Sequence, residues 1–214
     1  MDTHTLDFTR MSEEDMRRHA QDLRARLEQR RSVRAFSDEP VPLEVVRDAI
    51  MAASSAPSGA NKQPWTFALV TSAQVKRAIR EAAEEEERAF YGGRAPQSWL
   101  DDLKHLGTDH HKPFLEQAPV LIVAFAQTQQ EDGGKHYYVK ESMGLACGML
   151  IAALHMSGLA TLTHTPSPMG FLSKVLKRPP HERAFLLLPV GYPAEDCEVP
   201  VLTKKSPQEV IVEY

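Results

Sequence analysis

The chain has 214 residues, a formal net charge of -4 at pH 7, 42% hydrophobic residues and 25% charged residues. This composition is typical of a globular domain with a buried core, and the negative charge disfavours a general nucleic-acid surface. With two cysteines and no run near the roughly 18 apolar residues of a membrane span, the chain is expected to be cytoplasmic, without a disulfide framework or a membrane anchor.

The first predicted element is a helix that begins after Ser12. A hydroxyl followed by three acidic residues is typical of a helix start, because both satisfy the free N–H groups of the first turn. Apolar residues then recur at helical spacing until the chain reaches the cluster Arg30-Arg31-Ser32-Val33-Arg34.

Two interpretations of this cluster remain open from the residues alone. If the segment is extended, Arg30, Ser32 and Arg34 share one face, and Arg31 and Val33 share the other. Guanidinium groups and a hydroxyl then favour an anion or phosphate site. The alternative is a solvated basic end of a helix, where cations suit the negative terminus of the dipole.

A second helix is predicted to begin near Pro42, and a loop of small residues follows over 54–61. Such a loop lets backbone N–H groups approach a flat ligand, although an ordinary connection has the same composition. A strand is predicted over 65–70 and a long helix from Ser72 to about Phe90.

The stretch from Gly92 to Gln117 is polar and long for a connection, which is typical of a functional lid or a linker. Adjacent His110 and His111 do not have the spacing of metal ligands, so no metal site is predicted.

The remaining elements are strands over 120–126, 159–165 and 184–190, a helix over about 136–156, and an extended tail over 200–214. The helix is rich in glycine and alanine, which suits a core helix or a subunit interface. Strands and helices alternate loosely, so the fold class is α/β or α+β.

Together these pieces resemble the nitroreductase superfamily of FMN enzymes. The resemblance rests on the cluster at 30–34 and on four further segments. These are Pro57-Ser58-Gly59-Ala60, Gln63-Pro64-Trp65, Thr163-His164-Thr165-Pro166 and Leu188-Pro189-Val190-Gly191-Tyr192-Pro193. It implies a three-layer α+β fold with a mostly antiparallel central sheet, formed by one domain over 1–214. It also implies an intertwined homodimer with FMN sites at the interface and a mobile lid at about 87–117.

The resemblance also implies which residues hold FMN: Arg30, Arg31, Ser32, Val33, Arg34, Ser58, Thr163, His164, Thr165 and Lys204. Thr165 is the expected hydroxyl donor to the flavin N5 and the expected catalytic residue. His164 departs from the threonine usual in the family. The basic residue near the C-terminus is Lys204, or Lys205 if the register shifts by one.

Within the superfamily, the predicted lid resembles that of the iodotyrosine deiodinases. Glu87 is expected to pair with a substrate ammonium and Lys112 with its carboxylate, while Tyr91 hydrogen-bonds and packs. The Ala60 N–H is expected to face the phenolate oxygen. Each residue also has an alternative without a binding role. Glu87 could be a surface acid, Tyr91 could anchor the end of a helix, and Lys112 could be a solvated charge.

The resemblance thus implies reductive dehalogenation of halotyrosines, with electrons from NAD(P)H or a separate reductase. The alternatives are a general NAD(P)H-dependent nitroreductase or quinone reductase, which shares the FMN residues but differs in the lid, and a non-enzymatic flavin or amino-acid binding protein.

Overall fold

The structure is a computed structural model that describes residues 2–130 and 132–214. The chain separates into two compact units, one up to Arg30 and one from Arg31 to Tyr214, and each is described by itself. The first unit contains α1 (Glu13–Glu28). The Ser12 side chain accepts a hydrogen bond from the Asp15 N–H, and acidic residues fill the first turn, so the predicted helix start is confirmed.

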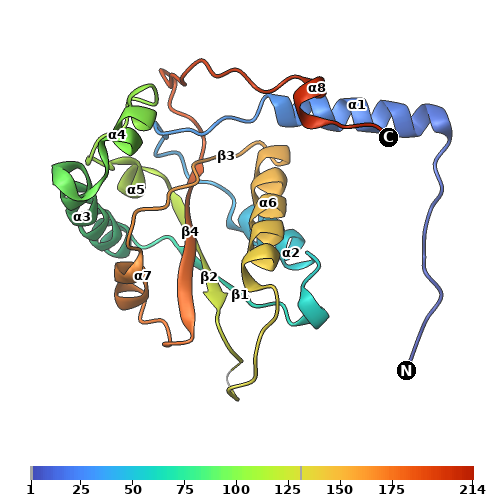
Figure 1. Cartoon of the computed structure of the whole chain (residues 1–214), viewed down its shortest axis with the longest axis horizontal. Helices are drawn as coiled ribbons and strands as arrows, with labels where there is room; N and C mark the ends of the chain where they lie inside the picture. Colours follow the sequence, from blue (N-terminus) through green and yellow to red (C-terminus); the bar gives the residue numbers. More distant parts are fainter. Residues whose placement is uncertain (1, 131) are drawn as a thin grey trace. The chain divides into compact units, whose positions relative to one another are not determined.

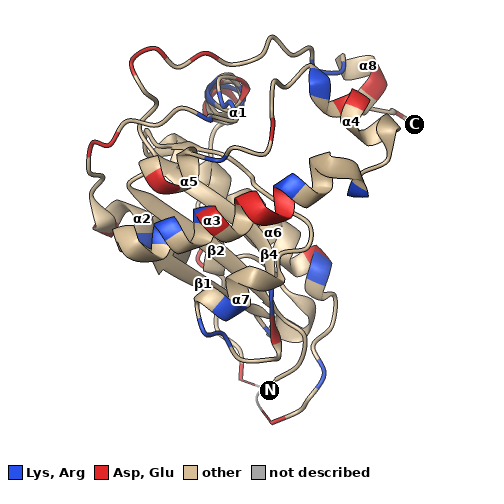
Figure 2. Cartoon of the chain, turned by 90° about the vertical axis from the view of Figure 1, so that its left-hand side faces the viewer, with Lys and Arg blue, Asp and Glu red and all other residues tan. Residues whose placement is uncertain are grey.

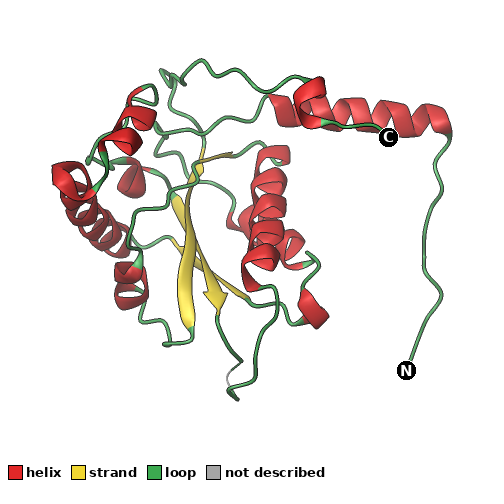
Figure 3. Ribbon diagram, viewed as in Figure 1, coloured by secondary structure: helices red, strands yellow, loops and turns green. Residues whose placement is uncertain are grey.

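The second unit is built on a four-stranded antiparallel sheet in the order β1-β2-β4-β3 (Figure 3). Its strands are β1 (Trp65–Val70), β2 (Val120–Gln127), β3 (Ala160–Thr161) and β4 (Glu182–Gly191). Residues 120–125 of β2 are buried without a break, as expected for a central strand that is covered on both faces. The mostly antiparallel sheet was predicted correctly.

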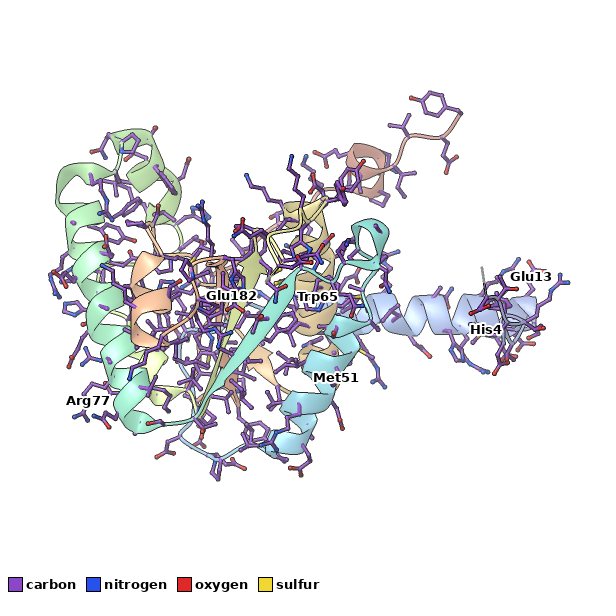
Figure 4. The ribbon with its side chains drawn as sticks, turned by 90° about the horizontal axis from the view of Figure 1, so that it is seen from below. His4, Glu13, Met51, Trp65, Arg77 and Glu182 are labelled. Carbon is purple, nitrogen blue, oxygen red and sulfur yellow. The ribbon has the colours of Figure 1, made fainter. Side chains whose placement is uncertain are left out.

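Helices cover both faces of this sheet and make three layers (Figure 1). One face is covered by α2 (Leu43–Ser54) and α6 (Val139–Met156), and the other by α3 (Ala73–Ala89), α5 (Phe114–Gln117) and α7 (Gly170–Val175). Figure 4 shows Met51 on α2 and Arg77 on α3 on opposite sides of the strands that carry Trp65 and Glu182.

Alternate residues of β2 divide the core between the two faces. Ile122 and Ala124 pack in the cluster beneath α2 and α6, whereas Leu121, Val123 and Phe125 pack beneath α3, α5 and α7. Each fully buried Leu, Ile or Phe side chain stabilises the fold by about 1.5–3 kcal/mol, so β2 ties both layers to one strand.

Three elements differ from the predictions. The helix expected from about residue 136 begins at Val139, because Tyr138 adopts a left-handed conformation. The strand expected over 159–165 contracts to β3 and a single bridge between His164 and Leu187. The tail, predicted as extended, contains α8 (Pro207–Val210).

The polar stretch after α3 is also more structured than a loop. It contains the π-helical turn η2 (Phe90–Arg94) and α4 (Gln97–Lys104) before α5 begins. None of the described helices combines the length and the apolar character needed to cross a bilayer.

Candidate functional site

Two adjoining cavities lie beside β3, with volumes of about 160 and 360 Å³, and both are lined by Arg34, Leu103 and Thr163. The smaller cavity is further lined by Glu87, Phe90, Tyr91, Trp99, Thr108, Lys112, His164, Thr165 and Ser167. The larger one is further lined by Arg31, Ser32, Leu106, Leu162, Pro200 and Leu202. The structure therefore brings together most of the predicted cofactor residues and the three predicted binding residues of the substrate's amino-acid part. We call these three residues, Glu87, Tyr91 and Lys112, the clamp.

The arginine segment is extended because it pairs with the edge of the sheet. Ser32 forms a parallel bridge with Thr161, and the Val33 N–H donates to the Thr161 carbonyl at 3.1 Å. Val33 is buried in the core, so only its backbone is available to a ligand. Ser32 and Arg34 share a cavity as predicted, but Arg31, predicted on the opposite face, lines that cavity as well.

Arg34 makes no hydrogen bond or ion pair with the part of the chain that the structure describes. Burial lowers the pKa of its guanidinium, with Tyr91 opposing this effect. Arg31 donates to the Pro200 carbonyl. A half-buried cation without a counter-charge favours an anion in this cavity. Arg30 belongs to the first unit, so its predicted role is not placed by the structure.

Thr163, His164 and Thr165 all line the smaller cavity; Thr163 and Thr165 are exposed, whereas His164 is buried. The His164 backbone exchanges hydrogen bonds of 2.8 and 3.1 Å with Leu187, and its ring lies edge-on to Phe114 at 5.4 Å between centroids. Burial, reinforced by the Lys112 and Arg34 charges, lowers the His164 pKa to about 3, so the imidazole is neutral. The family departure at His164 thus lies in the wall of the smaller cavity, at a residue that is 8% exposed.

The three predicted clamp residues meet in the smaller cavity. The Lys112 ammonium lies 3.5 Å from a Glu87 carboxylate oxygen and 5.6 Å from the centre of the Tyr91 ring. It also donates to the Thr108 hydroxyl at 3.1 Å and to the Asp109 carbonyl. The plain alternative of a solvated lysine is excluded, because the Lys112 side chain is 3% exposed.

Burial is the main cause of the pKa shifts in the clamp. It raises the pKa of Glu87, and the Lys112 charge opposes that rise. It lowers the pKa of Lys112, and the Glu87 charge opposes that fall. Each charge therefore offsets part of the cost of burying the other in a poorly solvated place.

Sequence reasoning identified Tyr91 of η2, but it assigned no site role to Phe90 of η2 or to Trp99 and Leu103 of α4, which also line the smaller cavity. The Trp99 ring lies edge-on to Phe90 at 5.1 Å, and Leu103 follows one turn later on α4. The Arg94 guanidinium pairs with Glu86 at 2.9 Å and donates to the Ser167 carbonyl, which joins this segment to the loop after Thr165. The spacing of Trp99, Leu100 and Leu103 was the available signal for this helix.

Ser58 and Ala60 do not line either cavity. Their loop contains the short η1 (Gly59–Asn61) and lies on the α6 side of the sheet, where a Cβ at Gly59 would meet the Tyr137 carbonyl at 2.8 Å. Figure 1 shows this teal segment after α2, away from α3 and α4. Within one chain, these residues therefore lie on the opposite face from the clamp.

The loop nevertheless has a specific shape. Ala60, Asn61 and Gln63 all have positive φ, at 50°, 52° and 47°, a conformation that costs energy for residues other than glycine. The Ser58 hydroxyl accepts from the Gln63 N–H at 2.9 Å. The Ala60 N–H donates to no described residue, so it is available to a ligand.

Lys204 and Lys205 are exposed and line neither cavity. The nearest tail residues that line one are Pro200 and Leu202. The predicted phosphate contact of Lys204 stays a prediction.

The nitroreductase family model matches residues 27–192 of the chain. An iodotyrosine deiodinase of Haliscomenobacter hydrossis is 56% identical over 192 residues, which cover 88% of this chain and 86% of the relative. The human iodotyrosine deiodinase 1 is 43% identical over 94% of this chain and 71% of its own length.

Among solved structures, an oxidized iodotyrosine deiodinase bound to FMN and 3-iodo-L-tyrosine matches with a TM-score of 0.77 and 33% identity, over 90% of this chain and 98% of that chain. A putative NADH dehydrogenase/NAD(P)H nitroreductase from Parabacteroides distasonis matches with a TM-score of 0.65 and 22% identity, over 90% and 98% of the two chains. At this identity the second likeness concerns the fold alone.

Proposed function

The chain belongs to the nitroreductase family, and from this premise we propose that it is an FMN-dependent oxidoreductase that removes the halogen from halotyrosines. The observation that carries the proposal is the buried pair of Glu87 and Lys112 beneath Tyr91, in a cavity that adjoins the arginine segment. A paired cation and anion in a poorly solvated cavity match the two charges of an amino acid.

The residues around the larger cavity fit FMN. Arg31 and Arg34 supply guanidinium groups, Ser32 supplies a hydroxyl, and Arg34 has no counter-charge among the described residues. We assign these residues to FMN, together with the Val33 backbone, Thr163 and His164 of the neighbouring segment, Arg30 and Lys204, and Ser58 from a second copy of the chain. When bound, reduced FMN supplies the two electrons that, with a proton, convert a carbon–halogen bond into a carbon–hydrogen bond and a halide ion.

Thr165 is the residue that we assign to catalysis. Thr165 lines the smaller cavity together with Thr163, and His164 between them fixes this segment by its backbone pairing with Leu187. A hydroxyl held in this way can donate a hydrogen bond to a polar ring atom without a large reorganisation.

Glu87, Tyr91 and Lys112 bind the amino-acid part of the substrate. The substrate ammonium replaces Lys112 beside Glu87, and its carboxylate takes the released Lys112 ammonium, so one buried ion pair becomes two. Tyr91 supplies a hydroxyl and a ring face at the same place. Segment 87–117, which we call the lid, then encloses the ligand and excludes water.

Completion of the site requires a second copy of the chain, because Ser58 and Ala60 lie on the other face of the sheet from the clamp. The exposed side of α6 suits such a contact. Leu145, Met149 and Met156 are exposed along one face, and a Cβ at Gly144 or Gly148 would meet nothing within 4 Å. We therefore assign a homodimer in which each site takes Ala60 from the partner copy, with the Ala60 N–H donating to the phenolate oxygen.

The dimer is tested by Leu145→Arg, which places a charge on this face. We expect a monomer in sedimentation velocity that retains little FMN. A variant that remains dimeric and yellow would contradict the assignment of this face.

Deiodination is tested anaerobically, with the flavin reduced by dithionite so that the result does not depend on whether NAD(P)H or a separate reductase is the donor. Addition of 3-iodo-L-tyrosine is expected to reoxidise the flavin and release tyrosine and iodide. Rapid reduction by NAD(P)H and turnover of a nitroaromatic compound, without iodotyrosine binding, would instead support a general nitroreductase or quinone reductase. Bound FMN and iodotyrosine without turnover would support a binding protein.

The cellular location that we propose is the cytoplasm. Cys147 and Cys197 are both free thiols, and Cys147 is buried, which fits a reducing compartment. Fractionation of cells that express the tagged chain tests this assignment.

A further inference from the structure

The backbone of Lys112 is attached to α3 by a residue that is not part of the clamp. The Lys112 N–H donates to the Glu84 Oε1 at 2.9 Å, and Glu84 is 9% exposed. A buried carboxylate that accepts a backbone N–H forms a charge-assisted hydrogen bond, which is stronger than one between neutral groups.

The other oxygen of Glu84 belongs to a chain of ion pairs that joins α3 to α5. Arg80 donates to Glu84 Oε2 at 2.8 Å and to Glu116 at 2.7 Å, and Arg77 donates to Glu116 at 3.0 Å. Figure 2 shows basic residues in the first half of α3 and acidic residues in the second half. Both oxygens of Glu84 therefore have partners, so the carboxylate has a defined position.

The Glu84 carboxylate, which holds the Lys112 backbone, lies on the same helix as Glu87 of the clamp. Glu84 and Glu87 are three residues apart on α3, so they share one face of the helix about one turn apart. Glu84 holds the Lys112 backbone, and the Lys112 side chain reaches along the helix to Glu87, where its ammonium lies 3.5 Å from the carboxylate. One helix thus fixes both ends of the same lysine.

We propose that Glu84 is a positioning residue for substrate binding: it holds the Lys112 backbone so that the ammonium is placed for the carboxylate of the halotyrosine. This inference rests on the proposed function. It also gives the lid a fixed point at Lys112, in addition to the contact of Arg94 with the Ser167 carbonyl.

A simpler role for Glu84 is to stabilise the packing of α3 against α5. The two roles predict different results, because loss of packing would weaken every ligand. Loss of positioning would weaken only a ligand with a carboxylate, and would leave FMN and an uncharged halophenol unaffected.

The experiment compares Glu84→Leu, Glu84→Gln and the matched control Glu85→Leu. Glu85 is exposed and follows Glu84 directly on the same helix. Three affinities are measured for each protein: that for FMN on the apoprotein, and those for 3-iodo-L-tyrosine and for 2-iodophenol on the FMN-loaded protein. The compound 2-iodophenol keeps the halogenated ring but lacks both charges. Titrations follow flavin fluorescence, and steady-state assays separate KM from kcat.

For Glu84→Leu we expect the iodotyrosine Kd and KM to rise by about tenfold, while the affinities for FMN and 2-iodophenol and the kcat change little. Glu84→Gln keeps an oxygen acceptor for the Lys112 N–H, so it should restore most of the affinity. Glu85→Leu should match the wild type. If Glu84→Leu does not fold, Glu84→Ala takes its place: it also removes the acceptor of the Lys112 N–H, so a loss for iodotyrosine alone would support the proposal and an equal loss for all three ligands would show a packing role.

Unchanged iodotyrosine affinity in Glu84→Leu, or a parallel loss of FMN and 2-iodophenol, would overturn the positioning role alone. A wild-type protein that binds FMN but not iodotyrosine would overturn the proposed function as well. The wild-type titration therefore separates the two failures.

Discussion

The ammonium of Lys112 lies 3.5 Å from the carboxylate of Glu87, and the two side chains are 3% and 12% exposed. In the absence of a ligand, the clamp therefore neutralises its own charges. A ligand with both an ammonium and a carboxylate replaces this pair by two pairs, whereas a ligand with one charge leaves a buried group without a partner. The uncompensated charge costs several kcal/mol, which makes the clamp selective for zwitterions.

The first prediction concerns the anionic half of the clamp. Glu87→Gln is expected to weaken binding of 3-iodo-L-tyrosine by roughly tenfold to a hundredfold, because a charge-assisted hydrogen bond becomes a neutral one. FMN should remain bound. Flavin fluorescence titration measures both, and Glu85→Gln is the control, because Glu85 is exposed two residues earlier on the same helix. Equal iodotyrosine affinity in wild type and Glu87→Gln would remove Glu87 from the clamp.

The pH dependence of binding should follow from the same pair. Burial raises the Glu87 pKa above its ordinary value of 4.5, so the carboxylate is lost, and iodotyrosine affinity falls, as the pH decreases through a value above 4.5. Burial lowers the Lys112 pKa below 10.5, so affinity also falls on the alkaline side at a pH below 10.5. Titrations between about pH 5 and 10 should give a bell-shaped profile.

In Glu87→Gln the part of the acid limb that belongs to Glu87 should be absent, and only the part that follows ionisation of the substrate phenol, measured separately on free 3-iodo-L-tyrosine, should remain. An acid limb that persists unchanged in Glu87→Gln would assign it to another group.

The guanidinium of Arg34 has no counter-charge among the described residues, so a bound anion should supply it. Arg34→Gln is expected to lower FMN affinity by roughly tenfold to a hundredfold. Arg34→Lys, which keeps the charge but loses the planar fork, should lie between this variant and the wild type. Equilibrium dialysis of the apoprotein measures the FMN Kd. Arg47→Gln, at an exposed position on α2, is the control and should have no effect.

His164 should make the fold sensitive to acid. Its pKa is about 3 in the folded chain, against an ordinary value of 6.5, so between these values the unfolded chain binds a proton that the folded chain does not. Stability therefore decreases as the pH falls through this window, by about 3 kcal/mol at pH 4 for this group.

His164→Thr removes this contribution. Urea unfolding at pH 7 and pH 4 should show a smaller loss of stability in His164→Thr than in the wild type. His19→Thr, at an exposed position, is the matched control. Equal losses in wild type and His164→Thr would show that the imidazole is protonated in the folded chain.

Local sequence patterns predicted the elements that depend on interactions between residues close together in the chain. The apolar run of β2 indicated a strand buried on both faces, and Ser12 with its acidic neighbours indicated the start of α1. The clamp residues Glu87, Tyr91 and Lys112 were also assigned to one place by resemblance, and the structure brings them together.

Other features depend on tertiary contacts that no local pattern contains. The segment 162–165 has the composition of a strand, but its pairing with β4 is limited to a bridge at His164 and one hydrogen bond from the Leu162 N–H, and Thr163 and Thr165 line the cavity instead. Ala60 and Lys112 occupy opposite faces of the sheet because the segment before β1 packs with α2 and α6 on one face, whereas the connection from β1 to β2 packs with α3 and α5 on the other. Glu84 was not distinguished from its acidic neighbours, because its burial becomes apparent only when α5 packs beside α3.

The separation of Ala60 from Lys112 has a genetic consequence. If each site combines the η1 loop of one copy with the lid of the other, two alleles damaged at these different places complement each other. A mixed dimer then contains one site with both defects and one site with neither. Co-expression of an η1-loop mutant and a lid mutant should therefore restore a fraction of the activity that neither mutant has alone.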